Sequence, residues 1–226
     1  MTELSNKVKR YFGEYAVDKK LAYELELAKL PRYVAEYLIS EFKFEGSGWE
    51  EKLRNFIKQH YYEPEEKELV KHRLITDGNV SIIDELRVVV DIETDTHVGI
   101  IQSHDILAEV PLSIVERNKA TLVTGMWGLI KLTKPTTIKY IFDQPVGAIV
   151  EKFTPFQAPD TDPKILAEAR GYFSLEEWID VLINTIGLEP RVYNQRQKLL
   201  LLTRLIPIVE GNTNMAEFGP RQTGKT

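Results

Sequence analysis

The sequence predicts an α+β protein: a helical N-terminal region, a small β-barrel, and further helices that lead into a truncated phosphate-binding core. Three observations support this prediction. Apolar residues recur at helical spacing from Val17 to about Thr76, and strings rich in β-branched and aromatic residues follow from Val80. The last eight residues form a glycine-rich phosphate-binding motif. We therefore expect regions at residues 1–78, 79–155 and 174–226, with a linker at 156–173.

Three helices are expected in the first region. Pro31 suits the first turn of a helix, and apolar residues follow it at helical spacing. Ser47 and Glu50 have the spacing of a capping box, so a second helix is expected from there. A third opens at Glu63 and Pro64 and stops at the turn signal TDGN.

Five strands are expected in the second region, because short β-branched and aromatic strings alternate with Gly, Pro and Asp. They are VSIIDELRVVVDIE, HVGII, TLVTGMWGLIKL, TIKYIF and GAIVEKF. The string PLSIVERN, between the second and third, is expected to form a short helix. This order is compatible with a closed barrel of the oligonucleotide/oligosaccharide-binding (OB) kind, and equally with a mixed open sheet.

Residues 155–173 have the composition of a linker, with three prolines among Asp and Thr. Beyond it, Ser174 and Glu177 form a second capping box, and Gly187 suits the C-terminal end of that helix. Another helix is expected after Pro190, through QKLLLLTRLI to about Val209. The string NMAEF that follows is expected to be a strand.

Composition narrows the classes of function. The chain has 226 residues, 43% of them hydrophobic, and a formal charge of −5, which argues against a uniformly basic nucleic-acid binder. It has no cysteine, which excludes disulfides, thiolate metal sites and a cysteine nucleophile and suits a reducing compartment. The charged N-terminus lacks a signal-peptide core, and no stretch approaches the ~18 apolar residues of a membrane span. We expect a soluble cytoplasmic protein without a membrane partner.

The motif GPRQTGKT satisfies the pattern G-x-x-x-x-G-K-[ST] of a Walker A loop. Glycines let backbone N–H groups turn onto phosphate oxygens, the lysine reaches the β- and γ-phosphates, and the last hydroxyl ligates magnesium. ATP and magnesium are therefore the expected cofactors of the intact protein, with Thr226 as the magnesium ligand. The expected nucleotide-binding residues are Gly219, Pro220, Arg221, Gln222, Thr223, Gly224, Lys225 and Thr226.

The same motif ends the sequence. The helix whose N-terminal amides complete a phosphate cradle would begin near Lys225, and the acidic residues that hold magnesium and activate water would come later. We therefore expect a fragment of a longer ATPase that binds or assembles, holds nucleotide weakly and does not hydrolyse it. No catalytic residue is assigned within it.

Several strings together resemble the N-terminal third of the Lon-like AAA+ proteins of bacteriophage-exclusion (BREX) systems. They are PRYVAEYLI, YYEPEEKELVKHRL, GMWGLIKL, SLEEWIDVLINTIGLEP and LLTRLIPIVEGNTNMAEFGPRQTGKT. The resemblance implies that residues 174–226 begin an AAA+ ATPase domain, that DNA is a partner in phage defence, and that ATP promotes a homo-oligomeric ring around it. Gln222 stands where the family loop is expected to have glycine. The family's Lon-like character leaves an alternative open, the N-terminal region of an ATP-dependent Lon-type peptidase that recognises a substrate or partner.

Two groups of basic residues are candidates for DNA contact. Lys131, Lys134 and Lys139 are expected on one hairpin around a proline, from which they would reach DNA phosphates. Arg117 and Lys119, just before the third expected strand, are a second candidate group. Ordinary solvated lysines that protect a sheet edge are the competing interpretation of the hairpin.

Other polar residues favour structural roles. The histidines lack a zinc-binding spacing, so surface or capping positions are expected for His60, His72, His97 and His104. Asp91, Glu93 and Asp95 alternate at the end of a long strand, where an exposed strand end explains them more simply than a cation site.

Overall fold

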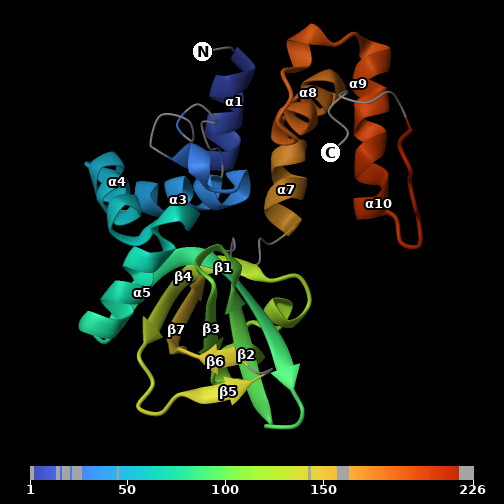
Figure 1. Ribbon diagram of the computed structural model, residues 1–226. Helices are drawn as coiled ribbons and strands as arrows, with labels where there is room; N and C mark the ends of the chain where they lie inside the picture. The colour runs from blue at the N-terminus through green and yellow to red at the C-terminus, as the bar shows by residue number, and fades with distance from the viewer. Residues whose placement is uncertain are drawn as a thin grey trace. The chain divides into compact units, whose positions relative to one another are not determined.

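The computed structural model describes residues 3–13, 16, 21, 27–44, 46–141, 144–156 and 163–218 (Figure 1). Contacts divide the chain into two compact units, residues 17–160 and residues 1–16 with 161–226. This division differs from the boundaries expected from the sequence. The helical layer and the barrel share one unit, and the first helix belongs to the other, because packing faces rather than chain order determine which elements associate.

The first unit is built on a closed barrel of five strands in the order β1-β2-β3-β7-β4. The strands are β1 (Asn79–Asp91), β2 (Thr96–Ile101), β3 (Ile106–Glu109), β4 (Met126–Thr133) and β7 (Ala148–Pro155). β1 is long enough to pair with β4 through its first part and with β2 through its second. The β3–β7 pairing is parallel and closes the barrel with the β4–β7 ladder.

The barrel interior is filled by alternate side chains of the strands, as the two-residue period of a strand requires. They include Val80, Ile82, Leu86, Val88, Ile101, Ala108, Ile130, Leu132 and Val150. Gly128 allows the closest approach of β4 to β7, since a Cβ there would lie 2.5 Å from the Thr154 carbonyl oxygen. The mixed open sheet is therefore wrong, and a closed barrel is confirmed.

The strand predictions were wrong at three places. The strand TLVTGMWGLIKL was expected to begin at Thr121, but β4 begins only at Met126. β3, with only four residues, was not expected, because so short a run carries little periodicity. The string TIKYIF does not enter the barrel; β5 (Lys139–Ile141) pairs with β6 (Gln144–Val146) in a separate two-stranded sheet. The expected short helix is confirmed as α6 (Leu112–Arg117), followed by the 3-10 turn η5 (Lys119–Leu122).

A helical layer packs on the barrel, partly over the outer face of β1 and β4 and partly, through Val70 and Leu74, against the barrel interior. It consists of η2 (Leu27–Lys29), α3 (Arg32–Phe44), α4 (Trp49–His60), η3 (Pro64–Glu66) and α5 (Lys67–Thr76). The apolar sides of α3 and α4 pack on Ile83, Trp127 and Leu129. The capping box at Ser47 was wrong: Gly48 is the N-cap of α4, at φ 78°, with no side-chain cap.

The second unit is helical. Its elements are α1 (Glu3–Phe12), α7 (Pro163–Arg170), α8 (Leu175–Thr185), η6 (Pro190–Val192), α9 (Gln195–Leu202), η7 (Thr203–Leu205) and α10 (Ile206–Val209). The Ser174–Glu177 capping box is confirmed, and α7 occupies much of the expected linker. The expected helix after Pro190 is instead divided into short pieces. The NMAEF strand is wrong, because residues 213–218 have no ladder partner in the described part of the chain.

Aromatic rings attach α1 to α7 and α8. The Tyr11 and Tyr172 rings stack with centroids 4.1 Å apart, and Phe12 lies 6.0 Å from Phe173 and 6.4 Å from Trp178. Aromatic ring pairs of this kind stabilise the packing by more than the burial of their apolar surface alone. The first residues of the chain thus help to build the unit that leads into the phosphate-binding motif.

Candidate functional site

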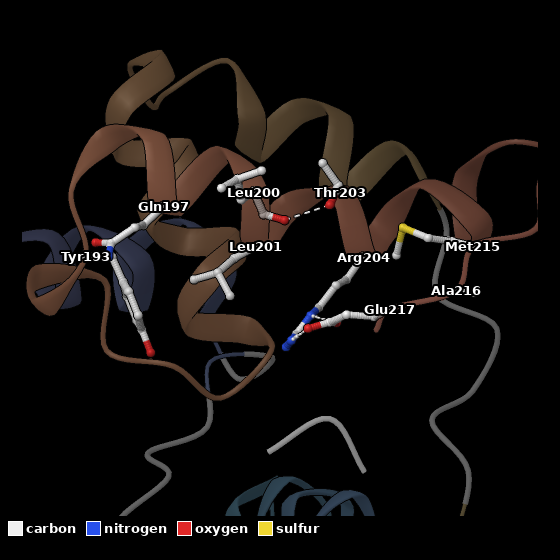
Figure 2. Close-up of a pocket in the computed structure, with 9 residues that line it drawn as sticks. All are labelled: Tyr193, Gln197, Leu200, Leu201, Thr203, Arg204, Met215, Ala216 and Glu217. Atoms are coloured by element: carbon white, nitrogen blue, oxygen red, sulfur yellow. Dashed lines mark hydrogen bonds and ion pairs between the residues drawn. The ribbon is translucent and has the colours of Figure 1, made fainter. Parts of the chain in front are cut away.

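A pocket of about 440 Å³ lies immediately before the phosphate-binding motif in the chain. Figure 2 shows α9 and η7 on one side and the extended residues 215–217 on the other. Apolar walls come from Leu200, Leu201 and Met215, and the polar lining from Tyr193, Gln197, Thr203, Arg204 and Glu217. Pockets of this size, mostly apolar with a few polar groups, hold small organic ligands.

An ion pair closes one wall of the pocket. Arg204 Nε and Nη2 donate to the two carboxylate oxygens of Glu217 at 2.9 and 2.7 Å (Figure 2). The hydrogen bond with Glu217 raises the pKa of Arg204. Because both side chains are more than a third exposed, the pair fixes geometry more than it stabilises the fold. It fastens the segment that enters the motif onto η7.

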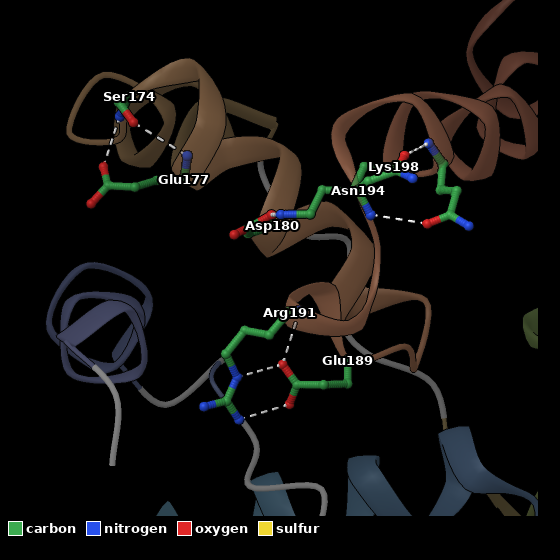
Figure 3. Close-up of polar contacts among 8 residues, drawn as sticks. Ser174, Glu177, Asp180, Glu189, Arg191, Asn194 and Lys198 are labelled. Atoms are coloured by element: carbon green, nitrogen blue, oxygen red, sulfur yellow. Dashed lines mark hydrogen bonds and ion pairs between the residues drawn. The ribbon is translucent and has the colours of Figure 1, made fainter.

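Three further contacts order the helices around the pocket (Figure 3). Lys198 Nζ donates to Asp180 Oδ1 at 2.5 Å and joins α9 to α8. The Asn194 side chain accepts from the Gln197 amide, and the Gln197 side chain accepts from the Asn194 amide, so the two residues form a reciprocal capping box at the start of α9. Arg191 forms a two-pronged contact with Glu189, which lowers the pKa of that carboxyl group. The pocket is therefore lined by a helix whose start and orientation are both fixed.

The expected nucleotide-binding residues, Gly219 to Thr226, lie outside the described residues. The structure reaches Phe218, whose side chain is 91% exposed. Glu217, the last residue that lines the pocket, stands two positions before Gly219 in the sequence. The pocket is thus adjacent in the chain to the motif that sequence reasoning found, and its lining was missed because those residues are spread over 25 positions.

The lysines expected on one hairpin are not on one hairpin. Lys131 lies in β4, which pairs with β1 and β7, whereas Lys139 opens β5, which pairs with β6. Lys131 Nζ donates to Glu151 Oε1 at 2.8 Å, and Lys139 Nζ to Glu109 Oε2 at 2.7 Å. Two of the three positive charges are thus balanced by acids, while Lys134 is exposed just after β4.

Arg117 and Lys119, the second candidate pair, are exposed. Arg117 ends α6 and Lys119 begins η5, so both lie on one corner between β3 and β4. Because this corner carries two exposed cations, it is accessible to an anionic partner. Arg117 and Lys119 therefore remain candidates for DNA contact.

A buried polar cluster was missed by sequence reasoning. His104, expected at the surface, is 1% exposed, and its Nδ1 lies 2.7 Å from Asp84 Oδ2. Ser103 Oγ and the Glu85 amide donate to Asp84 Oδ1 at 3.0 and 2.7 Å. Within the described part of the chain, His104 Nε2 has no hydrogen-bond partner. The contact between His104 Nδ1 and Asp84 Oδ2 links η4 (Gln102–His104) to the inside of β1.

The acids at the end of β1 were expected at an exposed strand end, but Asp91 is buried and the residues after it form a turn. Asp91 Oδ1 and Oδ2 accept from the Glu93 amide at 3.1 Å and from Thr94 Oγ1 at 2.6 Å. Across the described ranges, no group of His, Asp or Glu side chains is arranged to hold a metal ion. Among the same residues, no helix is both long enough and apolar enough to cross a membrane.

Comparison with known proteins identifies the class of protein to which this chain belongs. Residues 148–226 match the model of the ATPase domain of Lon-like protease BrxL-like proteins, and residues 10–133 match the N-terminal model of the BREX system Lon protease-like protein BrxL. The chain is therefore part of a Lon-like protein with an ATPase domain. It belongs to the BrxL family.

Two relatives agree over the full chain. A protein named Lon-like protease BrxL from Escherichia coli O9:H4 (strain HS) is 33% identical over 236 residues, covering 99% of this chain and 33% of the relative. A Bacillus cereus (strain H3081.97) protein of the same name is 32% identical, covering 100% of this chain and 34% of the relative. The chain thus spans about a third of the length of these relatives.

Proposed function

We propose that this chain is a region of an ATP-dependent Lon-like phage-defence factor. In this proposal it contacts nucleic acid and supplies part of the ATP-binding site. The observation that supports this most is the position of the pocket: Met215 to Glu217 line it, and the phosphate-binding motif begins two residues later. A nucleotide has an apolar base joined to anionic phosphates, so neighbouring apolar and phosphate-binding sites suit it.

In this proposal the adenine of ATP enters the pocket. Leu200, Leu201 and Met215 offer the apolar surface that the faces of a purine require. Lys225 would then approach the phosphates, and Thr226 would ligate the magnesium that accompanies them. The bidentate contact of Arg204 with Glu217 holds the wall in place. ATP-driven assembly of a homo-oligomeric ring belongs to the longer protein.

The barrel is proposed to be of the OB kind and to contact DNA. The strand order β1-β2-β3-β7-β4, with α6 between β3 and β4, supports this assignment. Lys134, Arg117 and Lys119 are exposed cations on its loops. A role in recognising a substrate or partner for a Lon-type peptidase is the second candidate, favoured by the name that both relatives carry.

Nucleotide binding is tested by titrating a fluorescent ADP analogue, with adenosine, guanosine nucleotides and tripolyphosphate as competitors. Met215→Ala and Tyr193→Ala are expected to weaken competition by adenosine, whereas Val192→Ala, at an exposed neighbour outside the lining, is the matched control. Lys225→Ala is expected to weaken competition by tripolyphosphate alone. If the two pocket variants compete with adenosine as well as the parent does, the base does not occupy the pocket.

DNA contact is tested by fluorescence anisotropy of labelled single strands and duplexes at low and moderate salt. Binding is expected to fall with salt and to weaken when Lys131, Lys134 and Lys139 are replaced together by Ala. A triple variant at Lys52, Lys58 and Lys71 removes the same charge from the helical layer and serves as the control. Equal effects of the two variants would show that net charge, and not the barrel, governs binding.

A further inference from the structure

The two-stranded sheet β5–β6 lies against the outer face of the barrel beside β2 and β3 (Figure 1). Ile141 and Val146, 2% and 3% exposed, form an apolar cluster with Val98, and Val89 and Leu107 pack against it. The Gly147 amide donates to the Leu107 carbonyl oxygen at 3.1 Å. Lys139 Nζ donates to Glu109 Oε2 at 2.7 Å. Apolar, backbone and ionic contacts thus attach one side of this sheet to the barrel.

This position blocks a surface that barrels of this kind commonly use. OB barrels bind oligonucleotides on the face of their second and third strands and on the adjoining loops. Here the outward side chains Val98 and Leu107 of those strands are covered by the chain's own β5–β6. An oligonucleotide therefore meets the outer side of β5–β6 first, and not the strands beneath it.

The outer side of β5–β6 is apolar. Successive side chains of a strand point to opposite faces, so Tyr140 points away from the barrel where Lys139 and Ile141 point toward it, and Ile138 immediately precedes the strand. Ile138 is 59% and Tyr140 71% exposed. Pro145 is directly opposite Tyr140 in the β5–β6 register and is also exposed. Tyr140 and Pro145 thus share one solvent-facing side of an anchored sheet, and the exposed Ile138 lies just before β5.

The charge of the surrounding sequence favours an anionic partner. Residues 126–156 contain four lysines and two acids, whereas the whole chain has a formal charge of −5. Lys134 and Lys152 in this stretch are both exposed. An exposed aromatic side chain and exposed cations in one stretch of the chain suit single-stranded nucleic acid, because bases stack on the ring and phosphates pair with the cations.

We propose that an unpaired nucleic-acid strand binds the outer side of β5–β6, with one base stacked on Tyr140 and flanked by Ile138 and Pro145. This proposal rests on the nucleic-acid contact proposed above and assigns that contact to a surface. Lys131 and Lys139 then serve chiefly as structural partners of Glu151 and Glu109. The strand must be locally unpaired, because a base in a duplex has no free face for the ring.

The test is a titration of the protein into fluorescein-labelled single strands and duplexes, and into a strand that carries 2-aminopurine. Tyr140→Ala is expected to weaken single-strand binding about 5- to 150-fold, since stacking on an aromatic ring contributes ~1–3 kcal/mol per base. Tyr140→Phe is expected to restore binding, because the ring stacks without its hydroxyl group. Tyr33→Ala, at another exposed tyrosine, is the control. The 2-aminopurine fluorescence should be quenched by the parent protein and by Tyr140→Phe, but not by Tyr140→Ala.

The outcomes separate this proposal from the one on which it rests. If Tyr140→Ala binds single strands as tightly as the parent, β5–β6 is not the contact, while nucleic-acid binding by the barrel still stands. Tighter binding of duplexes than of single strands, or failure of Tyr140→Phe to restore binding, would also overturn stacking. If neither nucleic acid binds at low salt to protein whose thermal unfolding is normal, both proposals fail.

Discussion

Lys7 donates to both carboxylate oxygens of Glu177, at 2.9 and 2.7 Å, although the two residues are 170 positions apart. Glu177 also accepts from the Ser174 amide at 2.8 Å, as the reciprocal half of the capping box of α8. One carboxylate thus caps a helix and binds the first helix of the chain to it. The contact with Lys7 is the largest of the influences that lower the pKa of Glu177.

We expect this contact to make the attachment of α1 sensitive to acid. A carboxyl group whose pKa is lower in the folded state stabilises that state above its unfolded pKa, and the contribution is lost as pH falls through the folded pKa. Glu177 has a reference value of 4.5, so the loss should begin below about pH 5. Hydrogen exchange of α1 amides at pH 7 and pH 3.5 measures how much of this stabilisation of α1 is lost in acid. In Lys7→Met the difference between the two pH values should shrink, and an unchanged difference would show that other groups control it.

Ser174→Ala should destabilise α8 by about 1 kcal/mol, because the serine hydroxyl oxygen accepts from the Glu177 amide at the helix start. Ser47→Ala is the matched control, since Gly48 caps α4 without any side-chain bond. Denaturant unfolding, with hydrogen exchange of the first-turn amides, distinguishes them. Equal losses in the two variants would mean that serine substitution, and not capping, is being measured.

His104→Leu should lower the free energy of unfolding of the barrel unit by roughly 1–3 kcal/mol, because it leaves the buried Asp84 Oδ2 without its hydrogen-bond partner. Asp84→Leu should cost a similar amount for the complementary reason. The double variant removes both polar groups, so its cost should be well below the sum of the two. Additive costs in this double-mutant cycle, measured by urea unfolding, would show that the two residues do not interact.

Gly128→Ala should destabilise the barrel by about 1–3 kcal/mol, the usual cost of overpacking. A Cβ at this position would lie 2.5 Å from the Thr154 carbonyl oxygen and 2.6 Å from the Phe153 ring. Gly147→Ala is the control, because a Cβ there has no atom within 4 Å among the described residues. Thermal unfolding of both variants compares them, and a Gly128→Ala protein as stable as the parent would contradict the close approach of β4 to β7.

The local sequence was sufficient to predict those features that one short segment determines by itself. The capping box at Ser174, the helix α6 and most of the barrel strands are specified by residues within a few positions of one another. The phosphate-binding motif is the extreme case, because eight consecutive residues define its chemistry. Family membership is equally a property of the amino-acid sequence, since it rests on the order and spacing of such short strings along the chain.

Tertiary structure decided what depends on residues distant in the chain. Ser47 has a perfect capping-box spacing but is not the cap, because the entry of the chain into α4 requires the positive φ of Gly48. Lys131 and Lys139 looked like one hairpin, yet strand pairing assigns them to different sheets and gives each an acid partner. The buried Asp84–His104 pair and the covering of the barrel face by β5–β6 likewise depend on contacts between residues that are distant in the chain. Local propensity is a weak preference, and burial against distant segments, which no short string contains, overrides it.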